Sequence, residues 1–191
     1  MLRSFNEAQK ENIRKNLIAE CKKSWSQHGY KKTSVSELSA KVGISTGAFY
    51  AFYDSKEALF CDVMDDFQES TRRMFDETLS SPPTKAEICH ALKKLYLEYA
   101  HNDIITKRHT PDYKSLLNNL PPEWRDRHRA NSINYLASTL FAPDTKLKVS
   151  KERAHGIIDT LLFSVANKEV IKDHYEIFCT LLECVINEIY E

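Results

Sequence analysis

The stretch Thr33–Leu59, TSVSELSAKVGISTGAFYAFYDSKEAL, decides the fold of this chain. Ser34 is followed three residues later by Glu37, which is the spacing of a capping box at a helix N-terminus. One helix is therefore expected from Val35 to about Val42. A second helix and the start of a third follow within the same stretch, so the chain must reverse direction here in very few residues.

Gly43 and Ser45 mark the turn between the first two expected helices. A glycine just past the last helical residue adopts the left-handed conformation that stops a helix, and a serine hydroxyl caps the next one. The second helix is expected from Thr46 to Tyr53. Phe49 and Tyr53 lie four residues apart, so they share the face that packs inward.

The N-terminal end of this second helix carries only small side chains. Two helices joined by such a tight turn leave that end protruding, and a protruding helix end fits the major groove of double-stranded DNA. Backbone N–H groups there bind phosphate, and nearby hydroxyl and ammonium groups position a protein on the DNA backbone. The sequence therefore predicts a DNA-binding surface made of Thr33, Ser34, Ser45, Thr46, Gly47, Ala48, Tyr50, Ala51 and Lys56.

Several short motifs occur in a fixed order in this region: Gly29-Tyr30, Thr33-Ser34-Val35, Val42-Gly43-Ile44-Ser45, Gly47, Phe49-Tyr50 and Ser55-Lys56-Glu57-Ala58-Leu59-Phe60. Together they resemble the N-terminal domain of the tetracycline-repressor (TetR) family of bacterial regulators, over roughly the first third of the chain. The resemblance implies a DNA-binding head, a C-terminal domain that binds a small-molecule effector, and a homodimer. Ala51 and Phe52 differ from the family pattern, which often has a histidine, tyrosine or other polar residue there. This difference favours less specific DNA contacts.

Glycine and proline are scarce, with 4 Gly and 6 Pro in 191 residues, and the prolines all lie at or after Pro82. This scarcity predicts an all-α protein, because sheet proteins need many turn residues. A helix-turn-helix DNA-binding domain is expected over residues 1–54, ahead of an effector-binding and dimerisation domain over 55–191. Residues 55–79 are expected to form the connecting helix, and a shift of its far end would move the DNA-binding domain.

The two ends of the chain differ in charge, although the chain as a whole is neutral. The first 55 residues hold nine Lys and Arg against five Asp and Glu, so the remainder is net acidic. A basic head on an acidic body suits a protein that presents one end to DNA, although an ordinary solvated surface shows a similar bias. Apolar runs do not approach the ~18 residues of a membrane span, and charges interrupt any secretory signal. Together with five scattered cysteines that suit reduced thiols, this predicts a cytoplasmic protein without a membrane partner.

The last two expected helices, over 150–166 and 172–190, carry more apolar residues than one packing face needs. A second apolar surface indicates a second partner. These helices are therefore expected to pair with their symmetry mates as a four-helix bundle, which the family resemblance also implies. The alternative is a broad stripe buried within one subunit. The predicted dimer interface consists of Ile157, Ile158, Leu161, Phe178, Leu182, Val185, Ile186 and Ile189.

Aromatic residues are spread over the middle helices, where a small-molecule pocket is expected to be apolar with a few polar groups. The effector-binding candidates are Tyr96, Tyr99, Tyr113, Trp124, Tyr135, Phe141 and Phe163. Each of them taken alone also suits an ordinary hydrophobic core. The expected function is that of a repressor that binds a palindromic operator as a dimer and leaves it when the effector binds. A constitutive DNA-binding protein without an effector is the alternative.

Two Glu-x-x-His pairs, Glu87 with His90 and Glu152 with His155, raise the alternative of a di-metal helical-bundle enzyme. The helical phase of the first pair argues against it, because both residues lie opposite the apolar side of their helix. Phosphate-binding glycine loops and nucleophile elbows are missing from the sequence. The sequence therefore predicts a non-enzyme with no catalytic residues, no cofactor and no bound metal.

Overall fold

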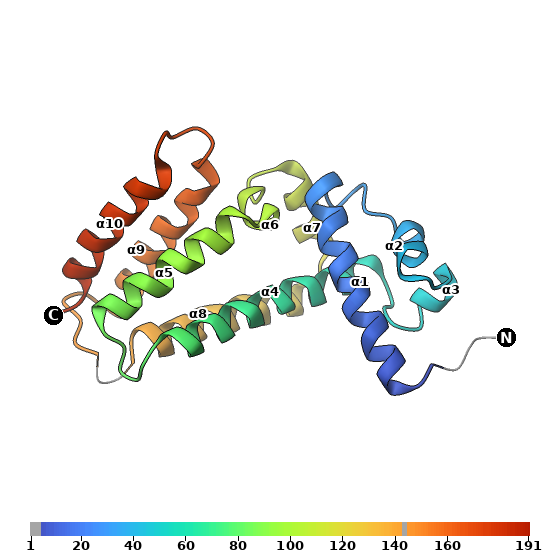
Figure 1. Cartoon of the computed structure of the whole chain (residues 1–191), viewed down its shortest axis with the longest axis horizontal. Helices are drawn as coiled ribbons and strands as arrows, with labels where there is room; N and C mark the ends of the chain where they lie inside the picture. The colour runs from blue at the N-terminus through green and yellow to red at the C-terminus, as the bar shows by residue number, and fades with distance from the viewer. Residues whose placement is uncertain (1–4, 143–144) are drawn as a thin grey trace. The chain divides into compact units, whose positions relative to one another are not determined.

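The computed structural model describes residues 5–142 and 145–191, apart from the side chains of residues 103 and 104 (Figure 1). The regular elements of this described part are α-helices and one short 3-10 helix, which confirms the prediction of an all-α fold. An isolated bridge also pairs Leu147 with Tyr190. In chain order the elements are α1 (Glu7–His28), α2 (Val35–Val42), α3 (Thr46–Phe49), α4 (Lys56–Thr78), α5 (Lys85–Ala100), α6 (Asp103–Thr106), α7 (Pro111–Asn119), α8 (Pro122–Leu140), α9 (Lys151–Phe163), the 3-10 helix η1 (Ser164–Asn167) and α10 (His174–Ile189).

Single residues decide where the first helices begin and end. Asn6 and Gln9 form a reciprocal capping box at the start of α1, and Gly29, with a φ of 82°, ends that helix. Ser34 caps α2 by accepting a backbone N–H hydrogen bond at 3.5 Å. Gly43 ends α2 in the left-handed conformation, with a φ of 78°. The predicted bounds of α2 are therefore confirmed.

Helix α3 is shorter than predicted, since it ends at Phe49 and not at Tyr53. The Phe49 carbonyl accepts hydrogen bonds from the N–H groups of both Phe52, at 2.8 Å, and Tyr53, at 3.0 Å, which closes the helix in a tight turn. That turn carries Tyr53 into the core, with its ring centroid 5.7 Å from that of Phe49, whereas Tyr50 is 54% exposed. The predicted inward face of Phe49 and Tyr53 is confirmed.

The chain divides into two compact units. The first, which we call the head unit, comprises Met1–Phe67 with His109–Arg125; the second, the body unit, comprises Gln68–Arg108 with Asp126–Glu191. This division differs from the predicted domain boundary after residue 54. Helices α4 and α8 each contribute residues to both units, and α7 belongs to the head unit.

Aromatic side chains form much of the core of the head unit. Trp25 of α1 packs edge-on against Phe60 of α4, with 4.8 Å between ring centroids, and stacks with Tyr113 of α7 at 6.2 Å. Leu38 of α2 and Phe49 of α3 are buried in the same unit. Helix α2 packs against α1, and α3 packs against α2 (Figure 1). The two short helices therefore depend on the rest of the unit, because neither has the length to be stable alone.

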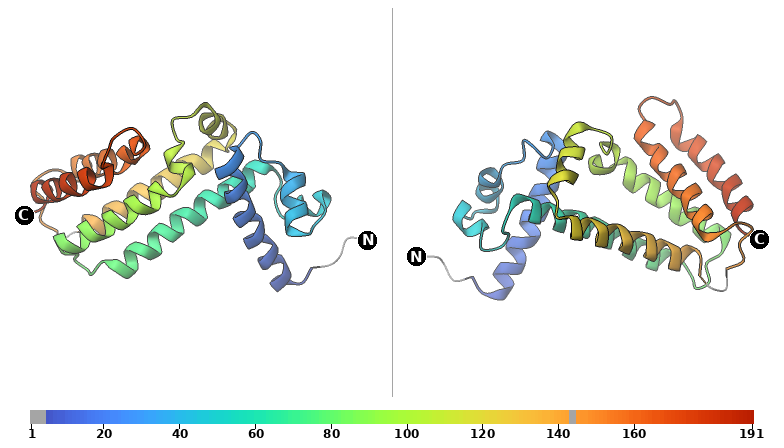
Figure 2. Two further views of the ribbon diagram at one scale, coloured as in Figure 1. Left: turned by 45° about the horizontal axis from the view of Figure 1, so that its top comes forward. Right: turned by 180° about the vertical axis from the view of Figure 1, so that it is seen from behind.

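Helices α5, α9 and α10 pack side by side in the body unit (Figure 2). The contact between them is apolar, with Leu92 and Leu95 of α5, Ile158 of α9, and Leu182 and Ile186 of α10 in one buried cluster. The face of α10 that carries Leu182 and Ile186 is therefore buried within a single chain. Over the described residues, the helices lack the combination of length and apolar character that a membrane span needs.

Candidate nucleic-acid interface

Backbone hydrogen bonds and one serine cap build the turn between α2 and α3. The Ile44 N–H donates to the Ser39 carbonyl at 3.0 Å. The Ser45 hydroxyl accepts the Ala48 N–H at 3.1 Å and starts α3. Helix α3 thus follows α2 with only the turn residues between them, which is the tight connection that the sequence predicts.

The start of α3 presents mostly small side chains to solvent. Ala48 is the exception, because its methyl group is buried at 6% exposure and packs beneath the helix. Ala48 therefore supports the surface and does not present its side chain on it. The surface itself, which we call the α3 surface, consists of Ser45, Thr46, Gly47, Tyr50 and Ala51, all exposed.

Thr33 is buried at 2% exposure, although its hydroxyl was expected to reach a DNA phosphate. The hydroxyl donates to the Gly29 carbonyl at 2.8 Å and lies 3.2 Å from the Ser24 hydroxyl. A hydroxyl enclosed in this way holds the turn between α1 and α2. The structure therefore corrects the predicted contact of this side chain, while the predicted cap Ser34 is half-buried at the start of α2.

Lys56 is half-buried at the first turn of α4 and is engaged by the protein itself. Its ammonium donates to the Tyr30 carbonyl at 3.0 Å and to the Thr33 carbonyl at 3.3 Å, and it lies 4.1 Å from the centroid of the Tyr30 ring. The Tyr30 hydroxyl in turn donates to the Glu57 carboxylate at 2.5 Å, and burial together with this bond raises the pKa of Tyr30. The first turn of α4 therefore holds the loop that leads into α2.

Phe52, which differs from the family pattern, has a structural role. Its ring centroid lies 5.9 Å from that of Phe5 and 5.9 Å from the guanidinium carbon of Arg14. Arg14 also lies 5.5 Å from the Tyr53 ring. Half-buried Phe52 thus attaches the turn after α3 to the start of α1, and Tyr50 is left as the large side chain of the α3 surface.

Sequence reasoning missed one residue of the head unit. The Asp112 carboxylate of α7 accepts hydrogen bonds from the backbone N–H groups of Tyr30 and Lys31, in the turn between α1 and α2. Asp112 and Tyr30 lie 82 residues apart in the chain. Local patterns carry no signal for a contact over that distance.

Most residues predicted at the dimer interface lie inside a single chain. They pack in the core of the body unit and leave little surface for a partner subunit: Ile158, Phe178, Leu182, Ile186 and Ile189 are each 3% exposed or less in the single chain. Ile157, Leu161 and Val185 are half-buried. Helix α10 exposes a different apolar row, in which Ile177 is 44% and Leu181 is 48% exposed, followed by exposed Cys184.

The predicted effector residues fall into separate packing clusters. Tyr113 and Trp124 belong to the head unit, where Tyr113 stacks on Trp25 and the Trp124 indole N–H donates to the Asp65 carboxylate at 3.0 Å. The other candidates belong to the body unit. These two residues are therefore accounted for by packing within the head.

In the body unit, the remaining candidates differ in their surroundings. Tyr96 and Phe141 are buried in the apolar core, and the Tyr135 hydroxyl donates to an α4 carboxylate at 2.7 Å. Tyr99 and Phe163 stack on each other, with 6.0 Å between ring centroids. The expectation of one shared aromatic pocket is corrected, and the Tyr99–Phe163 pair is the part of it that the structure brings together.

Ionisable side chains surround the Tyr99–Phe163 pair. The guanidinium carbon of Arg108 lies 3.9 Å from the Phe163 ring centroid, and the Asp159 carboxylate lies 3.4 Å from His155 Nδ1. Burial raises the pKa of Asp159 against the opposing charges of His155 and Arg108, and burial followed by the Asp159 charge raises the pKa of Tyr99 to about 12. His155 Nε2 is buried without a hydrogen-bond partner in the described part of the chain. An aromatic pair beside polar groups of this kind suits a small polar molecule.

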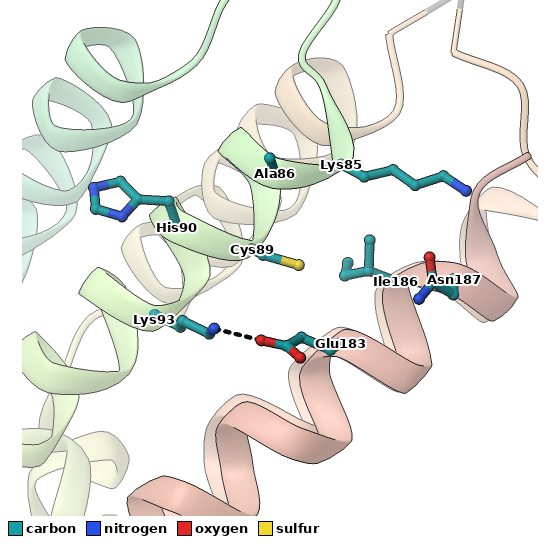
Figure 3. Close-up of a pocket in the computed structure, with 8 residues that line it drawn as sticks. All are labelled: Lys85, Ala86, Cys89, His90, Lys93, Glu183, Ile186 and Asn187. Carbon is teal, nitrogen blue, oxygen red and sulfur yellow. Dashed lines mark hydrogen bonds and ion pairs between the residues drawn. The ribbon is translucent and has the colours of Figure 1, made fainter.

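A depression of about 450 Å³ lies between α5 and α10 (Figure 3). Its lining mixes charged and polar side chains with Ala86, Cys89 and Ile186, and the Lys93 ammonium donates to the Glu183 carboxylate across it at 2.7 Å. None of the predicted effector residues lines this depression. It does not correspond to the aromatic pocket that the sequence predicts.

Glu87, from the first Glu-x-x-His pair, caps a helix. Its Oε2 atom accepts hydrogen bonds from the Thr84 N–H, the Thr84 hydroxyl and the Ser80 hydroxyl, each at 2.8 Å. His155, from the second pair, faces Asp159. Among the described residues, no group of three or more His, Cys, Asp or Glu side chains is placed to hold a metal ion.

Comparison with known sequences matches the region that contains the α2–α3 turn. Residues 17–63 match the family described as bacterial regulatory proteins, tetR family. Two proteins of Bacillus subtilis strain 168, both named as uncharacterized HTH-type transcriptional regulators, are similar to part of the chain. YdgC is 32% identical over 66 residues, which are 35% of this chain and 34% of that protein; YuxN is 39% identical over 57 residues, which are 30% and 20%. The matched region thus spans about a third or less of these relatives.

Solved structures resemble the chain over nearly its whole length. A TetR-family regulator from Rhodococcus sp. has a TM-score of 0.65 at 12% identity, covering 92% of this chain and 99% of that one. The fatty acid degradation regulator FadR from Bacillus halodurans has a TM-score of 0.63 at 13% identity, covering 96% and 97%. RolR in complex with resorcinol has a TM-score of 0.56 at 17% identity, covering 94% and 89%. The match of residues 17–63 agrees with the resemblance seen in the sequence: this region is similar to the bacterial regulatory proteins of the tetR family, and the whole chain shares the fold of the solved regulators.

Proposed function

We propose that this chain is a DNA-binding transcriptional regulator, most simply a repressor. It binds a palindromic operator as a homodimer and leaves the DNA when a small molecule binds its body unit. The observation that carries the proposal is the α3 surface, an exposed helix start with small side chains at the end of a tight helix-helix turn. It acts in the cytoplasm, where bacterial DNA lies, and neither catalysis nor a cofactor enters the proposal.

The α3 surface supports DNA binding in two ways. Thr46 and Gly47 leave room for the edge of a base pair, and backbone N–H groups at the start of a helix are suited to binding a phosphate. Tyr50 is 54% exposed beside them, which supports a contact between its hydroxyl and a phosphate. Lys56 uses two of its three N–H donors on backbone carbonyls, which leaves one donor for the DNA backbone.

The exposed row of α10 supports a dimer. Ile177, Leu181 and Cys184 follow one another at helical spacing on the side of α10 that faces away from the body core. Half-buried Ile157 and Leu161 supply apolar surface on the neighbouring helix α9. We propose that this second face, and not the buried one, pairs with its symmetry mate. A two-fold pairing then holds two α3 surfaces at a fixed spacing on a palindrome.

The body unit is the proposed place of effector binding. RolR, which shares this fold, was solved with resorcinol bound, so the fold accommodates a small molecule in at least one protein. In this chain we propose the Tyr99–Phe163 pair, with Arg108, His155 and Asp159 beside it, as the place where a small polar effector binds. The effector shifts the regulator by favouring a dimer geometry that no longer fits the operator.

Selection from a random pool of DNA duplexes tests the proposal. The full-length chain is expected to enrich a palindromic sequence, to bind it with nanomolar affinity at low salt, and to sediment as a dimer. Failure to retain any duplex at low salt would overturn the DNA-binding proposal. A thermal-shift screen of metabolites against the same protein then separates an effector-controlled repressor from a constitutive binder. Only the repressor is expected to have a compound that both raises its melting temperature and releases it from the selected duplex.

A further inference from the structure

The turn between α1 and α2 is held by a residue from a distant part of the chain. The Asp112 carboxylate accepts the Tyr30 N–H on Oδ2 at 2.6 Å and the Lys31 N–H on Oδ1 at 3.0 Å. Both of its oxygen atoms are thus used on two successive backbone N–H groups. Hydrogen bonds to an ionised acceptor are about twice as strong as those between neutral groups.

Gly29 makes this contact possible. A Cβ atom at this position would lie 2.7 Å from Asp112 Oδ2, a distance that real Cβ atoms essentially never show, and 3.1 Å from Asp112 Cγ. Gly29 also has a φ of 82°, which side chains disfavour. The position that ends α1 therefore requires glycine for a second reason, because a side chain there would occupy the space of the Asp112 carboxylate.

Helix α7 presents Asp112 in a fixed position. The Thr110 hydroxyl caps the helix by accepting the Tyr113 N–H at 3.2 Å, and Pro111 occupies its first turn. The Tyr113 ring stacks on Trp25 of α1. The carboxylate is therefore attached to a helix that packs on α1, and it does not sit on a loose loop.

The opposite side of the same turn is held by α4. Lys56 donates to the carbonyls of Tyr30 and Thr33, so Tyr30 is bound through its N–H by α7 and through its carbonyl by α4. Helix α2 starts at Val35, directly after this turn, and α3 packs on α2. The direction in which the α3 surface points therefore depends on a turn that is held from both sides.

We propose that Asp112 is a positioning residue for the α3 surface, because it holds the turn from which α2 and α3 follow. The proposal rests on the proposed function of DNA binding. Asp112 touches no DNA; it keeps the turn in the geometry that directs α2 and α3.

The test compares Asp112→Asn with Glu123→Gln. Both acids follow a proline at the start of a helix, α7 and α8, so both substitutions remove a similar charge from a helix N-terminus, but only Asp112 binds the turn. Affinity for the selected duplex is measured by fluorescence anisotropy at a temperature where circular dichroism shows both variants folded. Asp112→Asn is expected to lower affinity about tenfold and Glu123→Gln less than twofold. The slope of affinity against salt is expected to stay unchanged, because no phosphate contact is lost.

Amide hydrogen exchange of the full chain gives the second readout. Tyr30 and Lys31 are expected to exchange faster in Asp112→Asn, and α2 with them, while the buried core of α1 keeps its protection. Equal DNA affinity of the folded Asp112→Asn variant and the wild type would overturn the proposal, as would a reduced salt slope, which would make Asp112 part of the electrostatic contact itself. If the wild-type chain retains no duplex at all, the proposed function fails instead, and the two failures are distinct.

Discussion

Tyr50 and Tyr53 lie three residues apart, yet Tyr50 is on the surface and Tyr53 is in the core. Tyr50 is 54% exposed, whereas Tyr53 is buried and its hydroxyl donates to the Asp62 carboxylate at 2.9 Å. Burial, and then this hydrogen bond, raises the pKa of Tyr53. Tyr50→Phe is expected to weaken binding to every duplex by about 3–10-fold, because a hydroxyl that contacts phosphate positions the protein without reading sequence.

The matched control for Tyr50→Phe is Tyr53→Phe. It removes the same hydroxyl from the core, so it is expected to lower the free energy of unfolding by about 1 kcal/mol and to leave the affinity of the folded protein nearly unchanged. Anisotropy titrations on matched and mismatched duplexes, together with urea unfolding, measure both quantities. A change in the preferred sequence on Tyr50→Phe would show that Tyr50 reads bases.

Gly29 and Gly43 both have positive φ angles, 82° and 78°, but they differ in the space around them. A Cβ at Gly43 would meet nothing within 4 Å, whereas one at Gly29 would collide with Asp112. Gly43→Ala is therefore expected to cost about 1 kcal/mol of unfolding free energy, from backbone conformation alone. Gly29→Ala is expected to cost clearly more, of order 2–3 kcal/mol, because strain and collision add. Urea unfolding measures both variants. Equal losses of unfolding free energy would show that the Asp112 side chain moves away from the new methyl group at no cost in stability.

At the scale of elements, local signals explain which helices the sequence predicts. The serine before α2 and the glycine after it are enough to give its bounds, since caps and left-handed glycines act over one turn. The end of α3 was missed because it depends on packing, in which Phe52 leaves the helix to reach Phe5 and Arg14. The hold of Asp112 on the α1–α2 turn depends on a contact across 82 residues, which no local pattern encodes.

Helix α5 offers a test of capping through pH. Hydrogen bonds from the Thr84 N–H, the Ser80 hydroxyl and the Thr84 hydroxyl hold the pKa of Glu87 below its ordinary value of 4.5. A carboxyl group whose pKa falls on folding stabilises the fold above that ordinary value, and this stability is lost as the pH drops through the lowered pKa. Glu87→Gln is therefore expected to flatten the fall in melting temperature below about pH 5. Thr84→Ser, which keeps the hydroxyl, should retain the wild-type slope, and an unchanged slope in Glu87→Gln would refute the capping role.

At the scale of the whole molecule, the spacing of apolar residues predicts that α10 has two apolar faces, but it does not predict which face is buried in the core. Phe178, Leu182 and Ile186 are as apolar as Ile177 and Leu181, and each set follows helical spacing. The choice is made by α5 and α9, which bury the first set in the body core. The compact units differ from the predicted domain boundary for a similar reason, because α7 joins the head unit through Asp112 and Tyr113 and not through its place in the chain.

The two faces of α10 make opposite predictions for neighbouring residues. Leu181 is 48% exposed and Leu182 is 1% exposed. Leu181→Arg is expected to leave the helix content and melting of the isolated subunit intact while raising the dimer dissociation constant at least tenfold, because it places a charge on the proposed pairing surface. Leu182→Arg is expected to unfold the body unit, because it buries an unpaired charge. Sedimentation velocity with circular dichroism distinguishes these outcomes.

A stable Leu181→Arg dimer that still binds the selected palindrome would place the pairing surface away from this row. Conversely, loss of the dimer together with loss of palindrome binding would show that the spacing of two α3 surfaces, and not one surface alone, supplies the affinity for the operator.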